Sequence, residues 1–355
     1  MFVASAIAEA LRQAGCSDEE LCFIGSKRGM ERELLAEESS PVILLGGRGI
    51  KRSWKPRALL DNLGAAVGLL GALSHALWII GRQRPRAMVS VGGYAAFPAG
   101  LAAWAWRCPI VVINVDAVAG RTNRLLGLRA VASCVAFSGS GLKREVVTGA
   151  PVRPGFINLS REESARRAAK EVLGVNADRP LIAVVTGSLG AGSVNQAVAD
   201  LVERWREREI TIYHVTGSRD AEKFSHYGGM HGKLDYRVLS FEANVAGLYQ
   251  ASDLGITRAG ALTVAELCAA GLCAVLIPLP GAPGDHQTKN ALALVNAGGA
   301  CLLSDAELSA ARLDEVLSPL LDDATLRHSM EEAVSSLAHP YAAREAAKVV
   351  LDHAR

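Results

Sequence analysis

The chain is poor in the residue patterns that serve metal and redox chemistry. Its 355 residues include seven cysteines, and none of them forms a CxxC pair or a metal-ligand spacing with the histidines. An odd, scattered set of cysteines is typical of reduced, buried thiols in a cytoplasmic protein. No motif requires a metal ion or a cofactor, so we expect neither.

A strong net charge and clear membrane signals are lacking too. The 38 basic and 36 acidic side chains give a net charge of +2, which offers no general case for nucleic-acid binding. Neither a basic leader region nor a small-residue cleavage site opens the chain, so no signal peptide is predicted. One apolar run, residues 63–80, has the minimum length for a membrane span. Its three glycines and His75 favour a mostly buried helix in a soluble domain.

An opening strand with a glycine-rich turn is the third absence. Residues 1–15 instead place Phe2, Val3, Ala6, Ile7, Ala10 and Leu11 at helical spacing. Doubly wound α/β domains usually begin with a strand and such a turn. The chain is therefore expected to begin inside its first helix, with the first strand and glycine loop of that domain missing.

From Leu21 onward, strand-like and helix-like segments alternate, which predicts an α/β protein with two Rossmann-like, doubly wound domains facing a cleft. Predicted strands of the first domain cover residues 21–26, 41–47, 87–93, 109–115 and 132–138. Those of the second cover residues 181–187, 211–217, 235–241, 253–260, 273–280 and 299–305. The predicted domains are residues 1–153 and 154–355, with the last helix a candidate to pack back on the first.

Two glycine turns of the second domain could hold a phosphate. In residues 184–198, an apolar strand runs into Gly187, Ser188 and Gly190, and a helix containing Asn195 begins near Val194. Glycines let backbone N–H groups converge, and a helix N-terminus favours negative charge. The segment is not a P-loop. A plain strand–helix turn is the alternative.

The second turn, Arg258 to Gly260, precedes a helix whose first N–H groups would be free to hold a diphosphate. A carboxylate three residues beyond Thr263 suits two ribose hydroxyls better than a phosphate. The alternative is a capping box formed by Thr263 and Glu266. The predicted nucleotide contacts on this turn and helix are Arg258, Gly260, Ala261, Leu262, Thr263, Val264, Ala265 and Glu266.

Other strand ends carry weaker signals. His286 and Gln287 come after Asp285 at a helix start, and an N-cap with a solvated first turn is the simpler interpretation there. In the first domain, Gly92, Gly93 and Tyr94 come after one predicted strand. Asp116 comes after another and could act as a base, although a lone loop aspartate is more often a cap.

A basic cluster precedes the apolar run. It consists of Arg48, Lys51, Arg52, Lys55 and Arg57 around Trp54. Basic residues beside an aromatic ring and an apolar helix suit an anionic membrane surface, and a solvated loop is the alternative.

Six segments in this order resemble the MurG-type transferases of peptidoglycan synthesis, in glycosyltransferase family 28 with the GT-B fold. They are GGYAAFPAG (92–100), AGRTNRL (119–125), GAPVR (149–153), TGSLGAGSVNQA (186–197), RAGALTVAEL (258–267) and DHQTKNA (285–291). The resemblance implies inverting transfer of N-acetylglucosamine from UDP-N-acetylglucosamine to a polyprenyl-linked muramyl-pentapeptide. It also implies peripheral binding at the cytoplasmic face of the membrane, against its anionic surface.

The resemblance also implies residue roles. Arg153 and Ser188 would contact the donor, the run from Ala261 to Glu266 would hold the diphosphate and ribose, and Gln287 with His286 beside it would reach the sugar. Phe241 and Glu242 match the segment that touches uracil, while Asn123, Tyr94 and the preceding glycines would shape the acceptor side.

The chain also departs from the family pattern. The histidine-bearing opening loop is absent, residues 113–116 read INVD in place of HEQN, Thr186 replaces a glycine, and Glu242 replaces an apolar residue. Either a late start or a diverged paralogue explains the missing loop. A transferase with another lipid or small-molecule acceptor, and a non-catalytic UDP-sugar-binding protein, therefore stay open as alternatives. Asp116 is the internal candidate for the catalytic base.

Overall fold

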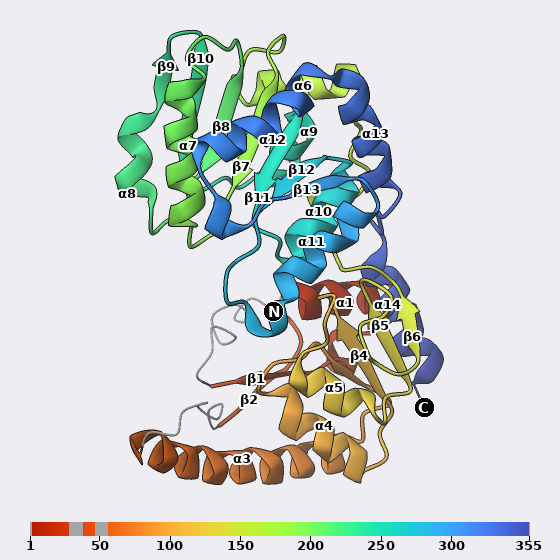
Figure 1. Ribbon diagram of the computed structural model, residues 1–355. Helices are drawn as coiled ribbons and strands as arrows, with labels where there is room; N and C mark the ends of the chain where they lie inside the picture. Colours follow the sequence, from red (N-terminus) through yellow and green to blue (C-terminus); the bar gives the residue numbers. More distant parts are fainter. Residues whose placement is uncertain (1, 28–37, 47–55, 355) are drawn as a thin grey trace. The chain divides into compact units, whose positions relative to one another are not determined.

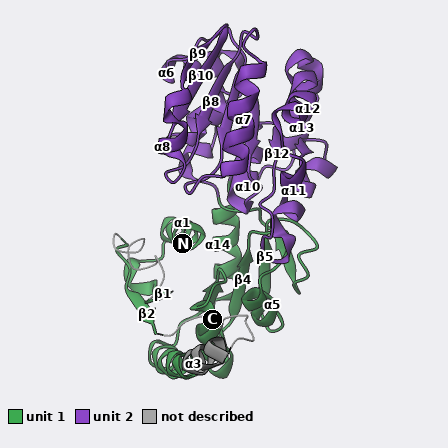
Figure 2. Ribbon diagram, turned by 60° about the vertical axis from the view of Figure 1, so that its left-hand side comes forward, with its two compact units in different colours: residues 1–151, 341–355 green, residues 152–340 purple. Residues whose placement is uncertain are grey.

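A computed structural model of the chain describes residues 2–27, 38–46 and 56–354, with side chains for all of these except 56–66. The chain divides into two compact units, residues 1–151 with 341–355 and residues 152–340 (Figure 2). Both units combine parallel sheets with covering helices, so the predicted α/β class with two Rossmann-like domains is confirmed.

The first unit has its described elements in this order: α1 (Phe2–Gln13), β1 (Phe23–Ser26), β2 (Val42–Leu45), α3 (Pro56–Gln83), β3 (Met88–Ser90), α4 (Ala96–Ala105), β4 (Ile110–Asn114), α5 (Arg121–Gly127), β5 (Ala132–Val135), β6 (Glu145–Val147) and α14 (Ala342–His353). The opening helix expected from apolar spacing is α1, which buries Ile7 and Leu11. The basic cluster lies outside the described residues, apart from the helical backbone of Arg57.

The strands of the first unit form two parallel sheets, where the sequence suggested one. β1 pairs with β2, while β3, β4, β5 and β6 form a separate sheet in that order. Helix α4 contacts β1, β3 and β4, so it spans both sheets.

Alternation along β4 shows how the first unit is layered. Ile110 and Val112 pack with α3 and α4, whereas Val111 and Ile113 pack with α1 and α14. Successive side chains of a strand point to opposite faces, and a strand covered on both faces is apolar throughout. The last helix of the chain therefore completes the core of the first unit.

Helix α3 corrects one prediction. Its buried stripe is Ala72, Ala76, Ile79 and Ile80. Val67, Leu70 and Trp78, by contrast, are 65%, 64% and 62% exposed. The run is thus one amphipathic helix with an uncovered apolar face, and not the mostly buried helix expected from its composition. Within the described residues, no helix combines the length and apolarity needed to span a membrane.

The second unit has its elements in this order: α6 (Glu163–Val172), β7 (Leu181–Val185), α7 (Gly192–Arg204), β8 (Thr211–Val215), α8 (Ala221–Phe224), β9 (Gly229–His231), β10 (Leu234–Leu239), α9 (Val245–Ala251), β11 (Leu254–Thr257), α10 (Ala261–Ala270), β12 (Ala274–Leu276), α11 (His286–Asn296), β13 (Ala300–Leu302), α12 (Ala310–Asp322) and α13 (Ala324–Ser335) (Figure 1). Short 3₁₀ turns η2 (Pro154–Phe156), η3 (Ser225–Tyr227), η4 (Pro283–Asp285) and η5 (Asp305–Glu307) join them, and η1 (Asp18–Glu20) belongs to the first unit.

The sheet of the second unit has the order β13-β12-β11-β7-β8-β10-β9, parallel except for β9 at one edge. Helices α7 and α12 cover one face through a core that includes Val184, Leu201 and Leu317. A Cβ placed on Gly255 would lie 3.5 Å from Leu267 of α10, so α10 lies on the other face. The strand order reverses between β7 and β11. At such a switch point, the loops after the two strands diverge and leave room for a ligand.

Candidate functional site

The loops after β7 and β11, in which the sequence predicts anion binding, lie at the switch point. After β7, Gly187 and Gly190 have φ of +88° and +82°, a backbone conformation that glycine adopts without strain. The side chain of Ser188 is exposed between them. Helix α7 then begins at Gly192, two residues before the predicted start.

Gly190 fits against the loop after β8. A Cβ at this position would lie 2.5 Å from the Thr216 carbonyl oxygen and 2.8 Å from a carboxylate oxygen of Asp220. No side chain is tolerated there without displacing backbone. Asp220 was missed from the sequence, although it comes after the strand "TIYHV" at the same edge of the sheet as the glycine loop.

Asn195 stabilises this loop through buried hydrogen bonds to the two residues that contact Gly190. It is fully buried, and its amide nitrogen donates to Asp220 (2.9 Å) and to the Thr216 carbonyl (3.0 Å). Its oxygen lies 2.9 Å from Nε2 of His214, whose Nδ1 lies 2.7 Å from the Tyr236 hydroxyl. This buried chain uses every polar atom of the Asn195 side chain, so Asn195 positions the loop and has no group left for a ligand.

Helix α10 begins directly after the second turn. Its N-cap is Gly260, which has no side chain to cap the helix, and its first intrahelical bond runs from the Val264 N–H to the Gly260 carbonyl (2.9 Å). The N–H groups of Ala261, Leu262 and Thr263 precede that bond and point along the helix axis. The capping-box alternative is wrong, because Thr263 lies inside the first turn and is not the N-cap.

Glu266 has a partner that the sequence did not suggest. Its buried carboxylate accepts two hydrogen bonds from Arg153, at 2.6 Å from Nε and 2.8 Å from the second terminal nitrogen. This pairing raises the pKa of the Arg153 guanidinium. Bidentate arginine–carboxylate pairs are strong and geometrically specific. Two predicted donor contacts, 113 positions apart in the sequence, are thus brought into direct contact.

The first turn of α11 carries the third group of predicted contacts, His286 and Gln287, and Asp285 lies directly before it. Asp285 adopts a left-handed conformation (φ +53°) and accepts a hydrogen bond from the Thr288 hydroxyl (2.7 Å). His286 Nδ1 lies 2.9 Å from the Pro283 carbonyl, and the Gln287 oxygen accepts the Leu279 N–H (2.9 Å). Asp285 is the N-cap residue by position, but its side chain does not cap the helix backbone.

Phe241 and Glu242 lie directly after β10. The Phe241 side chain is 68% exposed, while the Glu242 carboxylate is held by the Tyr213 hydroxyl (2.7 Å) and by the Asn244 N–H (2.7 Å). The unusual charge of Glu242 is therefore satisfied locally, and Phe241 presents an uncovered ring at the strand end.

In the first unit, the predicted acceptor-side residues gather at the ends of β3 and β4. Gly92 and Gly93 have φ of +86° and +85°. Buried Asn123 accepts from the Ser90 hydroxyl (3.2 Å) and donates to the Ile113 carbonyl (3.0 Å), so it ties the two strand ends together. The Tyr94 hydroxyl is buried without a hydrogen-bond partner among the described residues, and burial raises its pKa.

Asp116 lies in the loop after β4 and is partly exposed. Its backbone carbonyl accepts from the Asn114 amide (2.6 Å), which fixes the turn that carries it. Across the described segments of the chain, no three histidine, cysteine, aspartate or glutamate side chains gather as metal ligands. All seven cysteines are free thiols, and Cys22 is exposed, contrary to the expectation of buried thiols.

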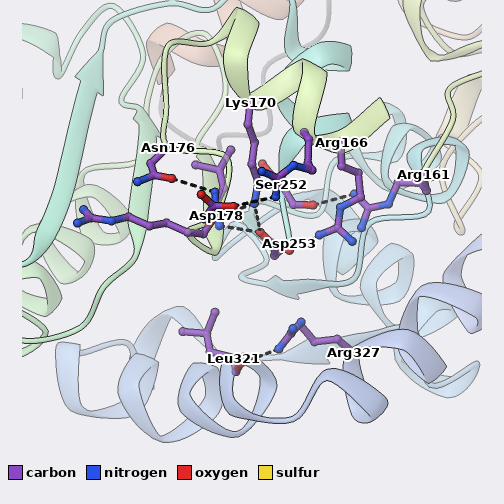
Figure 3. A network of polar contacts seen from close by, with 12 residues as sticks. Arg161, Arg166, Lys170, Asn176, Asp178, Ser252, Asp253, Leu321 and Arg327 are labelled. Atoms are coloured by element: carbon purple, nitrogen blue, oxygen red, sulfur yellow. Dashed lines mark hydrogen bonds and ion pairs between the residues drawn. The ribbon is translucent and has the colours of Figure 1, made fainter. Parts of the chain in front are cut away.

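A separate polar cavity of about 750 Å³ lies at the opposite edge of the second sheet. Asp253, just before β11, bonds Lys170 (3.1 Å) and Arg166, and Arg161 bonds the Ser252 carbonyl (2.7 Å) (Figure 3). Arg161 also bonds Glu331. Charges of both signs compensate one another here. The network fastens α6 and α13 to the start of β11 and serves the fold.

Two family models match the chain. Residues 1–133 match the glycosyltransferase family 28 N-terminal domain, and residues 181–348 match the glycosyltransferase family 28 C-terminal domain. The chain belongs to glycosyltransferase family 28. A relative from Alkalilimnicola ehrlichii is a UDP-N-acetylglucosamine–N-acetylmuramyl-(pentapeptide) pyrophosphoryl-undecaprenol N-acetylglucosamine transferase. It is 37% identical over an alignment of 363 positions that covers 100% of this chain and 96% of the relative.

Further family members agree. A transferase of the same description from Syntrophus aciditrophicus is 33% identical over 97% of this chain and 93% of its own length. The crystal structure of Acinetobacter baumannii MurG matches with a TM-score of 0.81 and 29% identity, over 99% of this chain and 95% of that one. The predicted resemblance to MurG-type transferases and the GT-B fold are confirmed. The calicheamicin glycosyltransferase CalG4, at 14% identity and a TM-score of 0.66, shares the fold.

Proposed function

We propose that this family 28 chain is an inverting hexosyltransferase. It moves N-acetylglucosamine from UDP-N-acetylglucosamine to undecaprenyl-pyrophosphoryl-muramyl-pentapeptide in lipid II synthesis. The observation that carries the proposal is the start of α10, where an uncapped first turn lies at the switch point with a buried carboxylate behind it. The names of the relatives supply the donor and acceptor.

Electrostatics explain how the start of α10 would bind a sugar nucleotide and stabilise its leaving group. The N–H groups of Ala261, Leu262 and Thr263 and the helix dipole favour a diphosphate, and they favour it more as negative charge builds up on the leaving group. The glycine loop offers further backbone N–H groups before Gly190, whose own N–H bonds the Gly187 carbonyl (3.0 Å). Transition-state stabilisation by fixed dipoles needs no metal ligand from the chain.

Arg153 and Glu266 would contact different parts of the nucleotide, the phosphates and the ribose. Paired, they cancel each other's charge in a partly buried place. A guanidinium suits phosphate oxygens, and a carboxylate accepts hydrogen bonds from two ribose hydroxyls. We infer that the bound donor forms hydrogen bonds with both side chains. Before the donor binds, the ion pair keeps each side chain close to the position in which it would contact the donor. Phe241 would lie beside the base, with His286 and Gln287 beside the sugar.

The acceptor hydroxyl must lose a proton as it attacks the sugar. Asp116 is the internal candidate for this base, because it lies at the carboxyl end of β4 on a turn fixed by Asn114. Gly92, Gly93 and Tyr94 line the neighbouring strand end and are assigned to the acceptor side.

The apolar face of α3 supports docking on the cytoplasmic face of the membrane. Val67, Leu70 and Trp78 are exposed on it, and the guanidinium of Arg82 lies 5.8 Å from the Trp78 ring. An amphipathic helix with aromatic and basic residues binds an anionic membrane surface peripherally.

Calorimetry with UDP and UDP-N-acetylglucosamine tests the donor site, and turnover with the lipid-linked muramyl-pentapeptide tests the reaction. We expect saturable binding of both nucleotides and transfer to the lipid. No saturable heat with either nucleotide would refute the proposal. Binding with turnover only on another lipid or a small-molecule acceptor would redirect it within the family. Binding without any turnover would identify a non-catalytic UDP-sugar-binding protein.

A further inference from the structure

Arg258 is a nearly buried arginine at the first position after β11. Its side chain is 13% exposed. One terminal nitrogen donates to the carbonyls of Ile277 (3.2 Å) and Pro278 (3.1 Å) and to the carboxylate of Asp305 (2.5 Å). The other donates to the Ser193 hydroxyl (3.1 Å). The guanidinium is therefore used by the protein itself, and its Nε is buried without a partner among the described residues.

The partners of Arg258 come from three other strand ends. Ser193 lies in the first turn of α7 after β7, Ile277 and Pro278 lie directly after β12, and Asp305 lies shortly after β13. Asp305 also accepts the Ser193 hydroxyl (2.8 Å), so Arg258, Ser193 and Asp305 form a closed triangle of hydrogen bonds.

The turn that Arg258 begins is fixed from its other side too. The carbonyl of Ala259 accepts a hydrogen bond from fully buried Asn290 of α11 (3.1 Å). Gly260 comes next as the N-cap of α10. Bonds to Arg258 and Ala259 thus set the position from which the first turn of α10 projects, relative to the glycine loop that leads into α7.

We propose that Arg258 is a positioning residue that aligns the α10 N-terminus with the glycine loop, and that it does not contact the donor. The inference rests on the proposed diphosphate site and replaces the donor-contact role suggested by the sequence. A planar guanidinium with several donors in a fixed fork can join these groups at once, whereas the ammonium of a lysine is a flexible point charge. Misplacing either half of an anion site by about 1 Å can cost roughly 100-fold in rate.

A double-mutant cycle separates positioning from contact. We expect Arg258→Ala and Asp305→Ala each to weaken UDP binding by roughly 10- to 100-fold and to lower kcat/KM similarly, because either change opens the triangle. The double variant should be no worse than the worse single variant. Arg258→Lys should recover only a small part of the UDP affinity that Arg258→Ala loses. Binding of uridine, which has no phosphates, should change less than twofold in all of them.

Other outcomes would overturn the inference. If Arg258 touched the diphosphate, Asp305→Ala would free its charge, and UDP binding would hold or strengthen while Arg258→Ala alone weakened it. Equal losses of UDP and uridine binding would indicate general damage to the fold. The matched control is Arg208→Ala, which breaks the bonds to Asp322 (3.1 Å) and to the Ser318 hydroxyl (2.8 Å) and should leave UDP binding unchanged. A parent protein that binds no UDP would refute the proposed function itself, before any variant is compared.

Discussion

At the scale of single residues, Glu266 gives the most direct test of the ribose assignment. We expect Glu266→Gln to weaken UDP binding by roughly 10- to 100-fold, since hydrogen bonds to a charged group contribute about 1.5–3 kcal/mol. The fold should survive, because Arg153 has a side chain that is 43% exposed and can be solvated. Calorimetry measures the affinity, and thermal unfolding checks the fold.

Glu331 supplies the matched control for that experiment. It also pairs with an arginine, Arg161, but beside the residues that precede β11, at the other edge of the sheet. Glu331→Gln should lower the unfolding temperature and leave UDP affinity intact. A Glu266→Gln variant that binds UDP as tightly as the parent would remove Glu266 from the ribose site.

His214 makes the second unit sensitive to acid. Burial lowers the pKa of its imidazole to about 3, against about 6.5 in the unfolded chain. Below pH 6.5, His214 is therefore protonated in the unfolded chain but stays neutral in the folded chain until the pH nears 3. This group alone should lower the free energy of unfolding by up to about 1.4 kcal/mol per pH unit between about pH 6 and pH 3. Above pH 7 it should have no effect.

The check is urea unfolding of the parent and of His214→Gln across that range. The variant should be less stable at pH 7, because the bonds to Asn195 and Tyr236 are disturbed, but its stability should fall less steeply with acid. His328→Gln, which changes an exposed histidine, should behave like the parent. Equal slopes for the parent and His214→Gln would show that His214 is not the group that titrates.

Hydrogen bonds between residues far apart in the chain set the limit of prediction from the sequence. The motif containing Asn195 was identified correctly as part of a glycine loop, but nothing in it reveals that the amide points inward to His214. The bond from Arg153 to Glu266 joins residues 113 positions apart, and the triangle with Asp305 depends on the order of strands. Local patterns carry no record of such long-range contacts.

At the scale of elements, the glycine loop after β7 depends on its contact with the loop after β8. We expect Gly190→Ala to weaken UDP binding at least tenfold. A methyl group would both strain a positive φ, at about 1–2 kcal/mol, and strike the Thr216 carbonyl at 2.5 Å. Gly139→Ala shares the strain (φ +80°) but has open space around it, so it should cost stability without changing UDP affinity.

Helix α3 provides the corresponding test of membrane docking. Replacing Leu70 and Trp78 together by serine should reduce sedimentation with anionic vesicles severalfold, since burial of each large apolar side chain contributes about 1.5–3 kcal/mol. UDP affinity should not change. Val172→Ser, which removes an apolar side chain 81% exposed on α6, is the control. Unchanged vesicle binding by the α3 variant would exclude this face as the membrane contact.

Elements with a strong apolar signal were the ones predicted well. Strands β4 and β7 are continuous apolar runs buried on both faces, and α1 has clear helical spacing. The short edge strands β6 and β9 were missed, because both are largely exposed and their residues have no apolar pattern. The burial of α3 was overestimated, because apolar residues such as Leu70 and Trp78 lie on its exposed face as well as on its buried stripe.

At the scale of the whole molecule, the α/β class could be predicted from alternation and the family from six short motifs. The sequence did not reveal that the strands of the first unit would separate into two sheets, since parallel strands look alike whatever their neighbours. Nor could it reveal which strand ends would adjoin at the switch point between β7 and β11.

The chain enters the first unit, leaves it after residue 151 and returns at residue 341 to add α14. The second unit is thus an insertion within the sequence of the first, joined to it at both ends. Deleting the final fifteen residues would remove α14 from the core around Val111 and Ile113. The deletion would therefore destabilise the first unit, although the second unit directly precedes these residues in the sequence. Circularly permuted or split versions of this protein should accordingly be cut at those two crossings.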